Sequence, residues 1–189
     1  MKKLWICLFG LLLSGCFAGT TKESTFYALK VDGGAITYTT PKISVNVENV
    51  RIPASIDKPQ IVTMNANGVE LEIHELDRWS EPLSFMIAGT LADDMALYLP
   101  KATVKNGGDV FETFTYTVSV DMIKFIGNGK EATLDAWWTV RDINETKVLS
   151  GRATYSEPTT QSYVDLATAQ SKMVSLLARD ISKKIAALK

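Results

Sequence analysis

Few side chains in this sequence could support catalysis, and their spacing brings no reacting pair together. His74 is the only histidine and both cysteines lie in the first sixteen residues, so four ligands for a structural zinc ion are not available. Asp93 and Asp94 are adjacent and would point about 100° apart on a helix, so we expect both to be solvated rather than to share a ligand. The sequence contains neither a glycine-rich phosphate loop nor a Gly-x-Ser-x-Gly elbow. We therefore expect no enzyme, no metal and no cofactor. We also expect His74 to be a surface residue at a strand end, and a base beside a carboxylate is the less favoured alternative.

Cys16 has a different chemistry, because the residues before it read as a leader. Lys2 and Lys3 precede an uncharged apolar run over residues 4–13. That run is too short to cross a bilayer core of roughly 30 Å and fits the apolar region of a signal peptide. Leu13-Ser14-Gly15-Cys16 resembles the lipobox of bacterial lipoproteins. The resemblance implies cleavage before Cys16, a diacylglyceryl group on its sulfur and an acyl chain such as palmitate on the new N-terminus. An ordinary secretory signal and an uncleaved anchor are the alternatives.

The leader divides the chain into three parts. We expect a signal peptide over residues 1–15, a lipidated tether over 16–24, and one periplasmic domain over 25–189. In enterobacterial lipoproteins, Asp after the cysteine tends to keep the protein in the inner membrane. Phe17 stands there in this chain, so we expect the periplasmic face of the outer membrane, with the inner membrane as the alternative.

Composition sets further bounds on the protein. The chain has 189 residues, of which 46% are hydrophobic and 22% are charged, as expected for a single globular domain. A formal net charge of −1 gives no reason to expect binding to nucleic acid, which requires a concentrated basic surface. Cleavage before Cys16 leaves one cysteine, so the domain cannot form an internal disulfide.

Hydrophobic patterning predicts strands and a helix in the first half of the domain. Short strands are expected at residues 26–29 and 43–50, and a hairpin joins residues 60–64 to 69–73 through a turn that ends in Asn67-Gly68. A helix should then begin at Ser80 as the N-cap, with Pro82 in its first turn, and stop before Pro100. Its apolar residues recur every three or four positions, which predicts one buried face. They are Leu83, Met86, Ile87, Thr90, Leu91, Met95 and Tyr98.

The second half predicts an antiparallel meander followed by a long helix. Apolar and polar residues alternate over 116–122 and 134–140, and a third strand is expected over 147–155. Ser162 and Asp165 resemble a capping box, and an apolar stripe then runs down a helix of about seven turns. The expected fold is mixed α/β, of the α+β kind: a mixed, largely antiparallel sheet packed by two main amphipathic helices.

Trp137 and Trp138 must point to opposite faces of their strand, so one of them belongs to the core. Trp137 shares its face with Asp135 and Thr139, which are polar. We expect a helix to cover this face, and the alternative is an exposed Trp137 that is available to a partner.

Four segments together resemble the PqiC (YmbA-like) family of auxiliary lipoproteins from intermembrane lipid transport systems. They are residues 26–29 (FYAL), 47–53 (VENVRIP), 56–62 (IDKPQIV) and 77–83 (DRWSEPL). The late strands and closing helix also fit, so the likeness covers nearly the whole mature chain. Residues 64–65 depart from the pattern, because many relatives have a longer polar continuation there.

The resemblance implies a partner and a way of working. Such proteins act beside MCE-domain proteins, which carry lipid across the periplasm, and relatives assemble into homo-oligomeric rings. The lipid on Cys16 would hold the domain at the membrane while its surface docks onto the MCE assembly. The candidate partner contacts are Ile52, Pro53, Asp57, Pro59, Arg78, Trp79, Pro82 and Trp137. The structural alternative is that the prolines shape a loop and that Trp79 fills the core.

Two other functions remain open from the sequence. The domain could be a periplasmic lipid-binding carrier, with an apolar cavity between its sheet and helices. It could also activate a cell-envelope enzyme, since the missing nucleophile–base pair argues only against catalysis by the chain itself.

Overall fold

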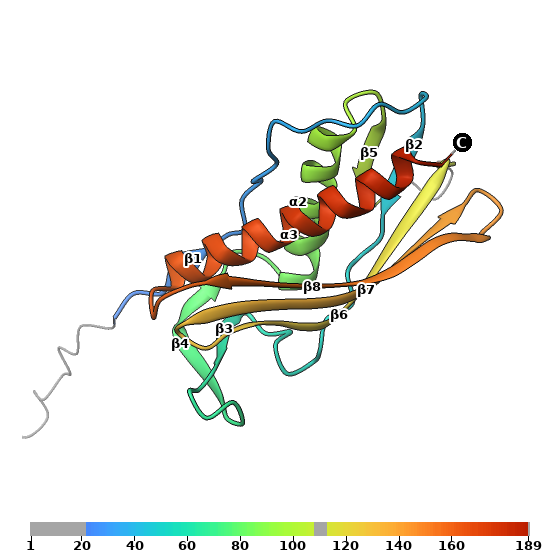
Figure 1. The fold of residues 1–189 in the computed structure, drawn as a ribbon. Coiled ribbons are helices and arrows are strands. Elements are labelled where there is room, and N and C mark those ends of the chain that lie inside the picture. The colour runs from blue at the N-terminus through green and yellow to red at the C-terminus, as the bar shows by residue number, and fades with distance from the viewer. Residues whose placement is uncertain (1–21, 108–112, 189) are drawn as a thin grey trace, which may run out of the picture.

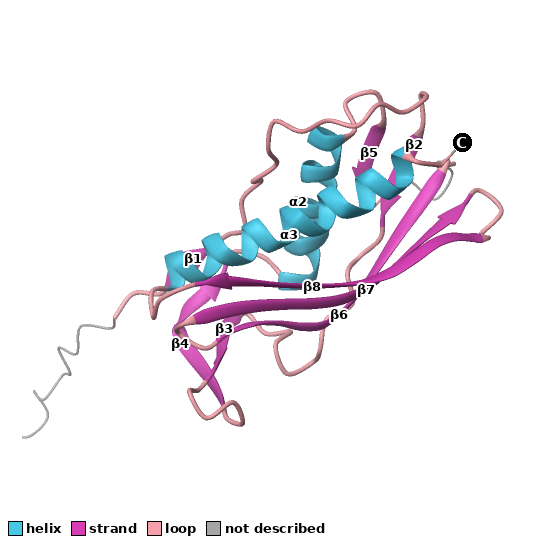
Figure 2. Ribbon diagram, in the orientation of Figure 1, coloured by secondary structure: helices cyan, strands magenta, loops and turns pink. Residues whose placement is uncertain are grey.

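A computed structural model describes residues 22–107 and 113–188. Cys16, the predicted signal peptide and most of the predicted tether lie outside these residues. The described chain forms two helices and two mixed sheets, so the predicted mixed α/β fold class is confirmed, although the strands divide into two sheets (Figures 1 and 2). Neither helix combines the length and apolar character that a bilayer crossing requires.

The larger sheet contains the predicted meander. Its strand order is β5 (Thr103–Asn106), β2 (Ser44–Val47), β6 (Tyr116–Gly127), β7 (Glu131–Asp142) and β8 (Lys147–Pro158). The β6–β7 and β7–β8 pairs are antiparallel, as expected, whereas β2 pairs in parallel with both β5 and β6. β5 was not predicted, because four residues are too few to show a clear alternation.

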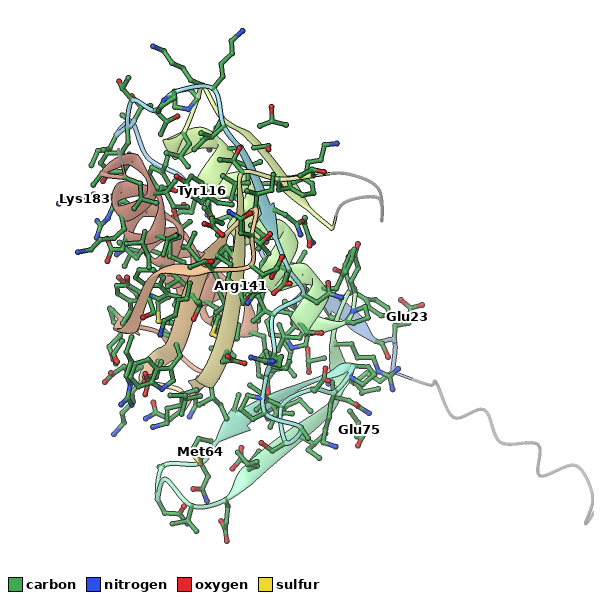
Figure 3. All side chains as sticks on the ribbon, turned by 90° about the vertical axis from the view of Figure 1, so that its right-hand side faces the viewer. Glu23, Met64, Glu75, Tyr116, Arg141 and Lys183 are labelled. Atoms are coloured by element: carbon green, nitrogen blue, oxygen red, sulfur yellow. The ribbon has the colours of Figure 1, made fainter. Side chains whose placement is uncertain are left out.

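The smaller sheet has the order β1 (Thr25–Tyr27), β4 (Leu71–Trp79) and β3 (Gln60–Met64). The predicted β3–β4 hairpin is confirmed, and Gly68 takes a φ of 75° in its turn. β1 pairs in parallel with β4. Figure 3 shows the hairpin, with Met64 and Glu75, projecting from the body of the molecule.

Helix α2 (Leu83–Tyr98) begins later than predicted. Pro82 is its N-cap, and the Pro82 carbonyl accepts hydrogen bonds from the N–H groups of Phe85 and Met86. The predicted capping role of Ser80 is therefore wrong, because its hydroxyl lies two residues before the cap and is 3.9 Å from the Met86 sulfur. All seven residues of the predicted apolar face are buried.

Helix α3 (Tyr163–Ala186) begins as predicted. The Ser162 hydroxyl accepts a hydrogen bond from the Asp165 N–H at 3.4 Å. The Thr160 hydroxyl completes the cap, because it accepts from the Ser162 N–H at 3.0 Å and donates to the Asp165 carboxylate at 2.6 Å. This arrangement fixes where α3 starts above the sheet.

The core lies between the two helices and one face of the five-stranded sheet. Its most buried members come from β2, β6, β7, α2 and α3, and include Val45, Val118, Leu134, Ile87, Leu91, Met173 and Leu177. The helices pack against each other as well as against the sheet. The opposite face of the sheet is left without a helix (Figures 1 and 2).

Candidate docking surface

Trp137 lies in the middle of β7 on the face of the sheet that no helix covers. Its side chain is 51% exposed, whereas Trp138 is buried toward α3. The expectation that a helix covers Trp137 is therefore wrong. Both helices are drawn to the other face, where β6 and β7 place their apolar side chains, so Trp137 stays among polar neighbours. Its direct neighbours are Asp121 on β6 and Arg152 on β8.

Arg152 holds the Trp137 ring in place. Its guanidinium carbon lies 5.5 Å from the ring centroid, within the range of a cation–π contact. The same guanidinium donates two hydrogen bonds to the Asp135 carboxylate, at 2.9 and 2.6 Å. These bonds hold the pKa of Asp135 below its usual value. Because the Arg152 guanidinium is bound to Asp135 and also contacts the Trp137 ring, the exposed ring has a defined position.

Arg51 brings a segment from far away in the sequence to the same face. Its guanidinium donates two hydrogen bonds to the Asp121 carboxylate, one of them at 2.6 Å. The Arg51 N–H donates to the Val120 carbonyl at 3.0 Å, and its own carbonyl accepts from the Met122 N–H at 2.8 Å. Residues 51–53 therefore continue beside β6 after β2 ends.

A third charged group lies further along this face. Arg141 on β7, which is labelled in Figure 3, donates to both oxygens of Glu48 at 2.8 Å and to Glu145 at 2.9 Å. The Ser119 hydroxyl also donates to Glu48. We use the name Trp137 face for the surface formed by Glu48, Arg51, Asp121, Asp135, Trp137, Arg141 and Arg152.

The Trp137 face has the character of a protein contact. Exposed ion pairs of this kind contribute only about 0–1 kcal/mol each to stability. A role in stabilising the fold therefore does not account for three of them on one face. Tryptophan and arginine are the residue types that most often dominate binding at protein interfaces. Each arginine is paired with a carboxylate, so the face carries little net charge and does not resemble a site for a charged substrate.

The other predicted contacts lie in the loop that joins β2 to β3 and at the junction of β4 with α2. The Pro53 carbonyl accepts from the N–H groups of Ile56 and Asp57, which closes a turn, and Ile56 is buried beneath it. Asp57 is exposed, whereas Pro53 is half-buried. Ile52 is half-buried and packs against the core.

Among the predicted contacts, Arg78 and Trp79 are the last residues of β4. The Trp79 N–H donates to the Pro59 carbonyl at 2.8 Å, so the structure does bring these segments together. Trp79 is 5% exposed, which favours its role in the core over a partner contact. Pro59 and Pro82 are exposed and Arg78 is half-buried.

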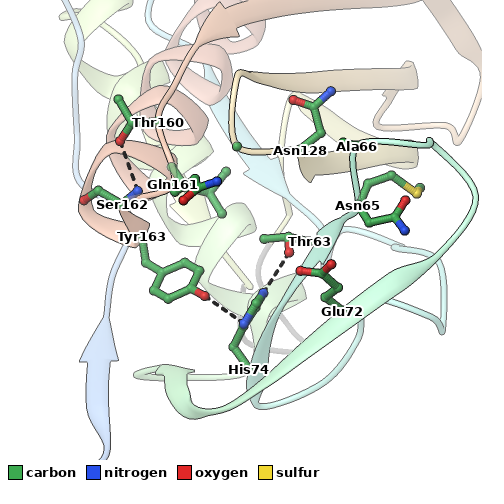
Figure 4. A pocket seen from close by; sticks show the side chains of 13 residues that line it. Thr63, Asn65, Ala66, Glu72, His74, Asn128, Thr160, Gln161, Ser162 and Tyr163 are labelled. Carbon is green, nitrogen blue, oxygen red and sulfur yellow. Dashed lines mark hydrogen bonds between the residues drawn. The ribbon is translucent and has the colours of Figure 1, made fainter.

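His74 is half-buried, so the expectation of a surface histidine is wrong. Its Nε2 lies 2.7 Å from the Thr63 hydroxyl and its Nδ1 lies 2.7 Å from the Tyr163 hydroxyl (Figure 4). These contacts connect the β3–β4 hairpin to the start of α3. They border a polar pocket of about 390 Å³, which Glu72 and Asn128 also line. Since both ring nitrogens are engaged, the ring serves as a structural link in this arrangement.

Asp94 is buried, so its expected solvation is wrong. Its side chain is 0% exposed, and its Oδ1 accepts from the Asp32 N–H at 3.0 Å. Burial raises the pKa of Asp94 to about 6, although hydrogen bonds from the backbone of Asp32 and Gly33 and from Ser175 oppose that shift. Asp94 thus holds the loop at residues 32–33 against α2. Asp93 is exposed, as predicted.

Comparison with known proteins supports both the fold and a family. A family model described as an ABC-type transport auxiliary lipoprotein component matches residues 27–182. The crystal structure of protein XCC0632 from Xanthomonas campestris, of the DUF330 family, has a TM-score of 0.68 at 15% identity and covers 86% of this chain and 94% of its own. The crystal structure of an uncharacterized protein also has a TM-score of 0.68 at 15% identity, and the match covers 87% of this chain and 99% of that protein's chain. At this identity the two structures support the fold alone. A search of the curated proteins found no match.

Proposed function

The chain belongs to the ABC-type transport auxiliary lipoprotein family, and from that premise we propose that it is a lipid-anchored docking subunit of an MCE-type intermembrane lipid transport system. In this proposal, lipid on Cys16 holds the domain at the periplasmic face of the outer membrane. The Trp137 face then receives the end of the MCE assembly. Several copies arranged as a homo-oligomeric ring, as the family resemblance implies, would present several such faces to one partner.

The exposed Trp137 is the observation that carries the docking role. A half-exposed tryptophan on an otherwise polar sheet face leaves apolar area in contact with water, and a partner that covers it would recover the free energy of burying that area. Arg152 and Asp135 already hold the ring in place, so little side-chain entropy remains to be lost on binding.

The filled interior favours docking over the alternative of a lipid carrier. A carrier needs a hollow between its sheet and helices that is large enough for acyl chains. In the described chain the space between the two helices and the central strands contains fully buried side chains from the sheet and from both helices, among them Leu91 of α2, Leu134 of β7 and Leu177 of α3. Lipid would have to displace these residues, so we place the function of this domain at its surface.

The test compares two side chains of equal exposure in the full chain. Trp137 and Phe85 are both 51% exposed, and Phe85 lies at the start of α2, near the predicted contacts at the junction of β4 with α2. Cells producing the full chain, Trp137→Ala or Phe85→Ala are crosslinked mildly. The membrane protein is then purified by affinity, and co-purified MCE-domain protein is measured by mass spectrometry.

We expect Trp137→Ala to lose most of the MCE-domain protein and Phe85→Ala to retain it. Truncating a central interface tryptophan commonly costs about 2 kcal/mol or more, which corresponds to roughly a thirtyfold loss of affinity. Loss with Phe85→Ala alone would move the docking surface to the start of α2. If the unchanged chain recovers cell-wall synthases and no MCE-domain protein, the transport role is wrong and the activator alternative is favoured.

A further inference from the structure

Strand β8 forms one edge of the five-stranded sheet, and half of its main-chain groups point away from the sheet. It is twelve residues long and pairs only with β7 among the described residues. The Thr159 N–H donates to the Lys130 carbonyl directly opposite, which sets the phase of the antiparallel ladder. Because hydrogen-bonded and outward-facing residues alternate, the N–H and C=O groups of Ser150, Arg152, Thr154 and Ser156 face outward.

A groove follows this edge, between β8 and α3. It consists of two neighbouring hollows of about 300 and 600 Å³, and residues of both β8 and α3 line each of them. The smaller hollow lies beside Glu157 and Lys172, and the larger one beside Ala153, Tyr155 and Asp180. Figure 1 shows α3 and β8 side by side, as their contacts require. We call this feature the β8 groove.

The unpaired charge of the larger hollow is positive. The carboxylate that lines it, Asp180, accepts hydrogen bonds from Tyr155 at 2.6 Å and from Arg179. In the smaller hollow, Glu157 pairs with Lys172 at 2.7 Å, and Asp165 accepts a hydrogen bond from the Thr160 hydroxyl. Lys183 and Lys184, on the last turn of α3, line the larger hollow and have no ion-pair partner in the described part of the chain. A ligand with carboxylates would therefore find unpaired ammonium groups there.

We propose that the β8 groove binds an extended acidic segment of a partner protein, which adds to the sheet as a strand beside β8. The outward main-chain groups would pair with the segment, and its alternate side chains would enter the groove between β8 and α3. Lys183 and Lys184 would select carboxylates at the end of the segment. Edge strands of β-sheets are normally short, charged or covered by another segment in soluble proteins. A binding role would explain why the edge of β8 stays open over residues 150–156.

This inference goes beyond the docking role, because it concerns the edge of the sheet and the groove beside α3 rather than the open face around Trp137, and it does not depend on lipid transport. Arg152 borders both surfaces, so the variants below leave it unchanged. Failure of the β8 groove to bind peptide would leave crosslinking through Trp137 unaffected. Conversely, peptide binding at β8 could be observed in a chain that recovers no MCE-domain protein.

The experiment uses a defined library of ten-residue peptides and the full chain in detergent. Valine or threonine occupies alternate positions, and the remaining positions contain Glu, Lys or Ser in all combinations. We expect the Glu-rich members to bind most tightly. On binding, the amide hydrogens of Arg152, Thr154 and Ser156 should exchange more slowly with solvent, because they become paired. The tightest peptide, remade with N-methyl groups on alternate amides, should bind at least about tenfold more weakly.

Two variants of the chain separate main-chain pairing from charge. Thr154→Pro removes an outward N–H but no donor to β7, so the ladder should persist while peptide affinity falls at least about tenfold. Thr154→Val keeps the N–H and is its matched control. The double substitution Lys183→Glu with Lys184→Glu should reverse the preference from Glu-rich to Lys-rich peptides, even if Thr154→Pro fails to fold.

Three results would overturn the proposal. One is that no library peptide binds with a Kd below about 1 mM. Another is that N-methylation of the peptide leaves its affinity unchanged, which would mean that its main chain does not form hydrogen bonds with β8. The last is that the same amides are already protected at concentrations at which the chain self-associates, which would assign the β8 edge to a second copy of this chain.

Discussion

Replacing Asp94 by Asn should change the pH dependence of stability in a way that its exposed neighbour Asp93 does not. Burial raises the pKa of Asp94 from 3.8 to about 6 in the folded protein. At a pH between these two pKa values, the Asp94 carboxyl is protonated in the folded state and ionised in the unfolded state. Stability therefore falls as the pH rises from about 4 to about 6, and levels off above about pH 7.

The magnitude follows from the size of the shift. A difference of about two pKa units at about 1.4 kcal/mol each corresponds to roughly 3 kcal/mol between pH 3 and pH 8. Asn carries no charge, so Asp94→Asn removes this term while keeping an oxygen that can accept from the Asp32 N–H. Relative to the unchanged protein, the variant should thus gain about 3 kcal/mol as the pH rises.

The assay is urea unfolding of the unchanged protein, Asp94→Asn and Asp93→Asn at intervals from pH 3 to pH 8. The free energy of unfolding of Asp94→Asn, minus that of the unchanged protein, should rise through pH 5–6 and then become constant. Asp93→Asn should run parallel to the unchanged protein, because Asp93 is exposed. If Asp94→Asn also runs parallel, the buried carboxylate is not protonated as we infer, and the reasoning is wrong.

Two further predictions address packing and the anchor. A Cβ on Gly151 would lie 2.7 Å from the Trp138 ring, so Gly151→Ala should lower the free energy of unfolding by roughly 1–3 kcal/mol. A Cβ on Gly34 would meet nothing within 4 Å, so thermal unfolding of Gly34→Ala should match the unchanged protein to within about 0.5 kcal/mol, and equal losses in the two variants would contradict this account. Cys16→Ala should abolish metabolic labelling with radioactive palmitate and block normal signal processing, and unchanged labelling would end the lipoprotein assignment.

Local sequence was sufficient for the elements whose pattern is long. The alternation over residues 116–122 and 134–140 predicted β6 and β7, and the spacing of apolar residues predicted the buried face of α2, because a side chain's direction follows from the local period. Ser162 marked the start of α3 for the same reason: a cap is made by residues next to one another. The family resemblance likewise depended on contiguous segments.

The errors at Asp94 and Trp137 have a common cause, since each concerns what lies opposite a side chain. Asp94 follows Leu91 by three positions and precedes Tyr98 by four, so its place in the buried stripe could be predicted. The loop whose Asp32 N–H donates to its carboxylate could not be predicted. The exposure of Trp137 depended on which face of the sheet the helices would cover.

The candidate surfaces therefore depend on tertiary structure more than on any motif. Arg51 and Asp121 are seventy residues apart, and Arg152 reaches Trp137 only because β7 and β8 pair in one register. The β8 groove exists only once α3 packs beside a strand edge. Sequence by itself determined the class of protein, the main helices and strands and the predicted site of lipid attachment, because those depend on neighbouring residues. Only the folded chain decided which charges meet and which faces stay open, because these depend on contacts between segments distant in the sequence.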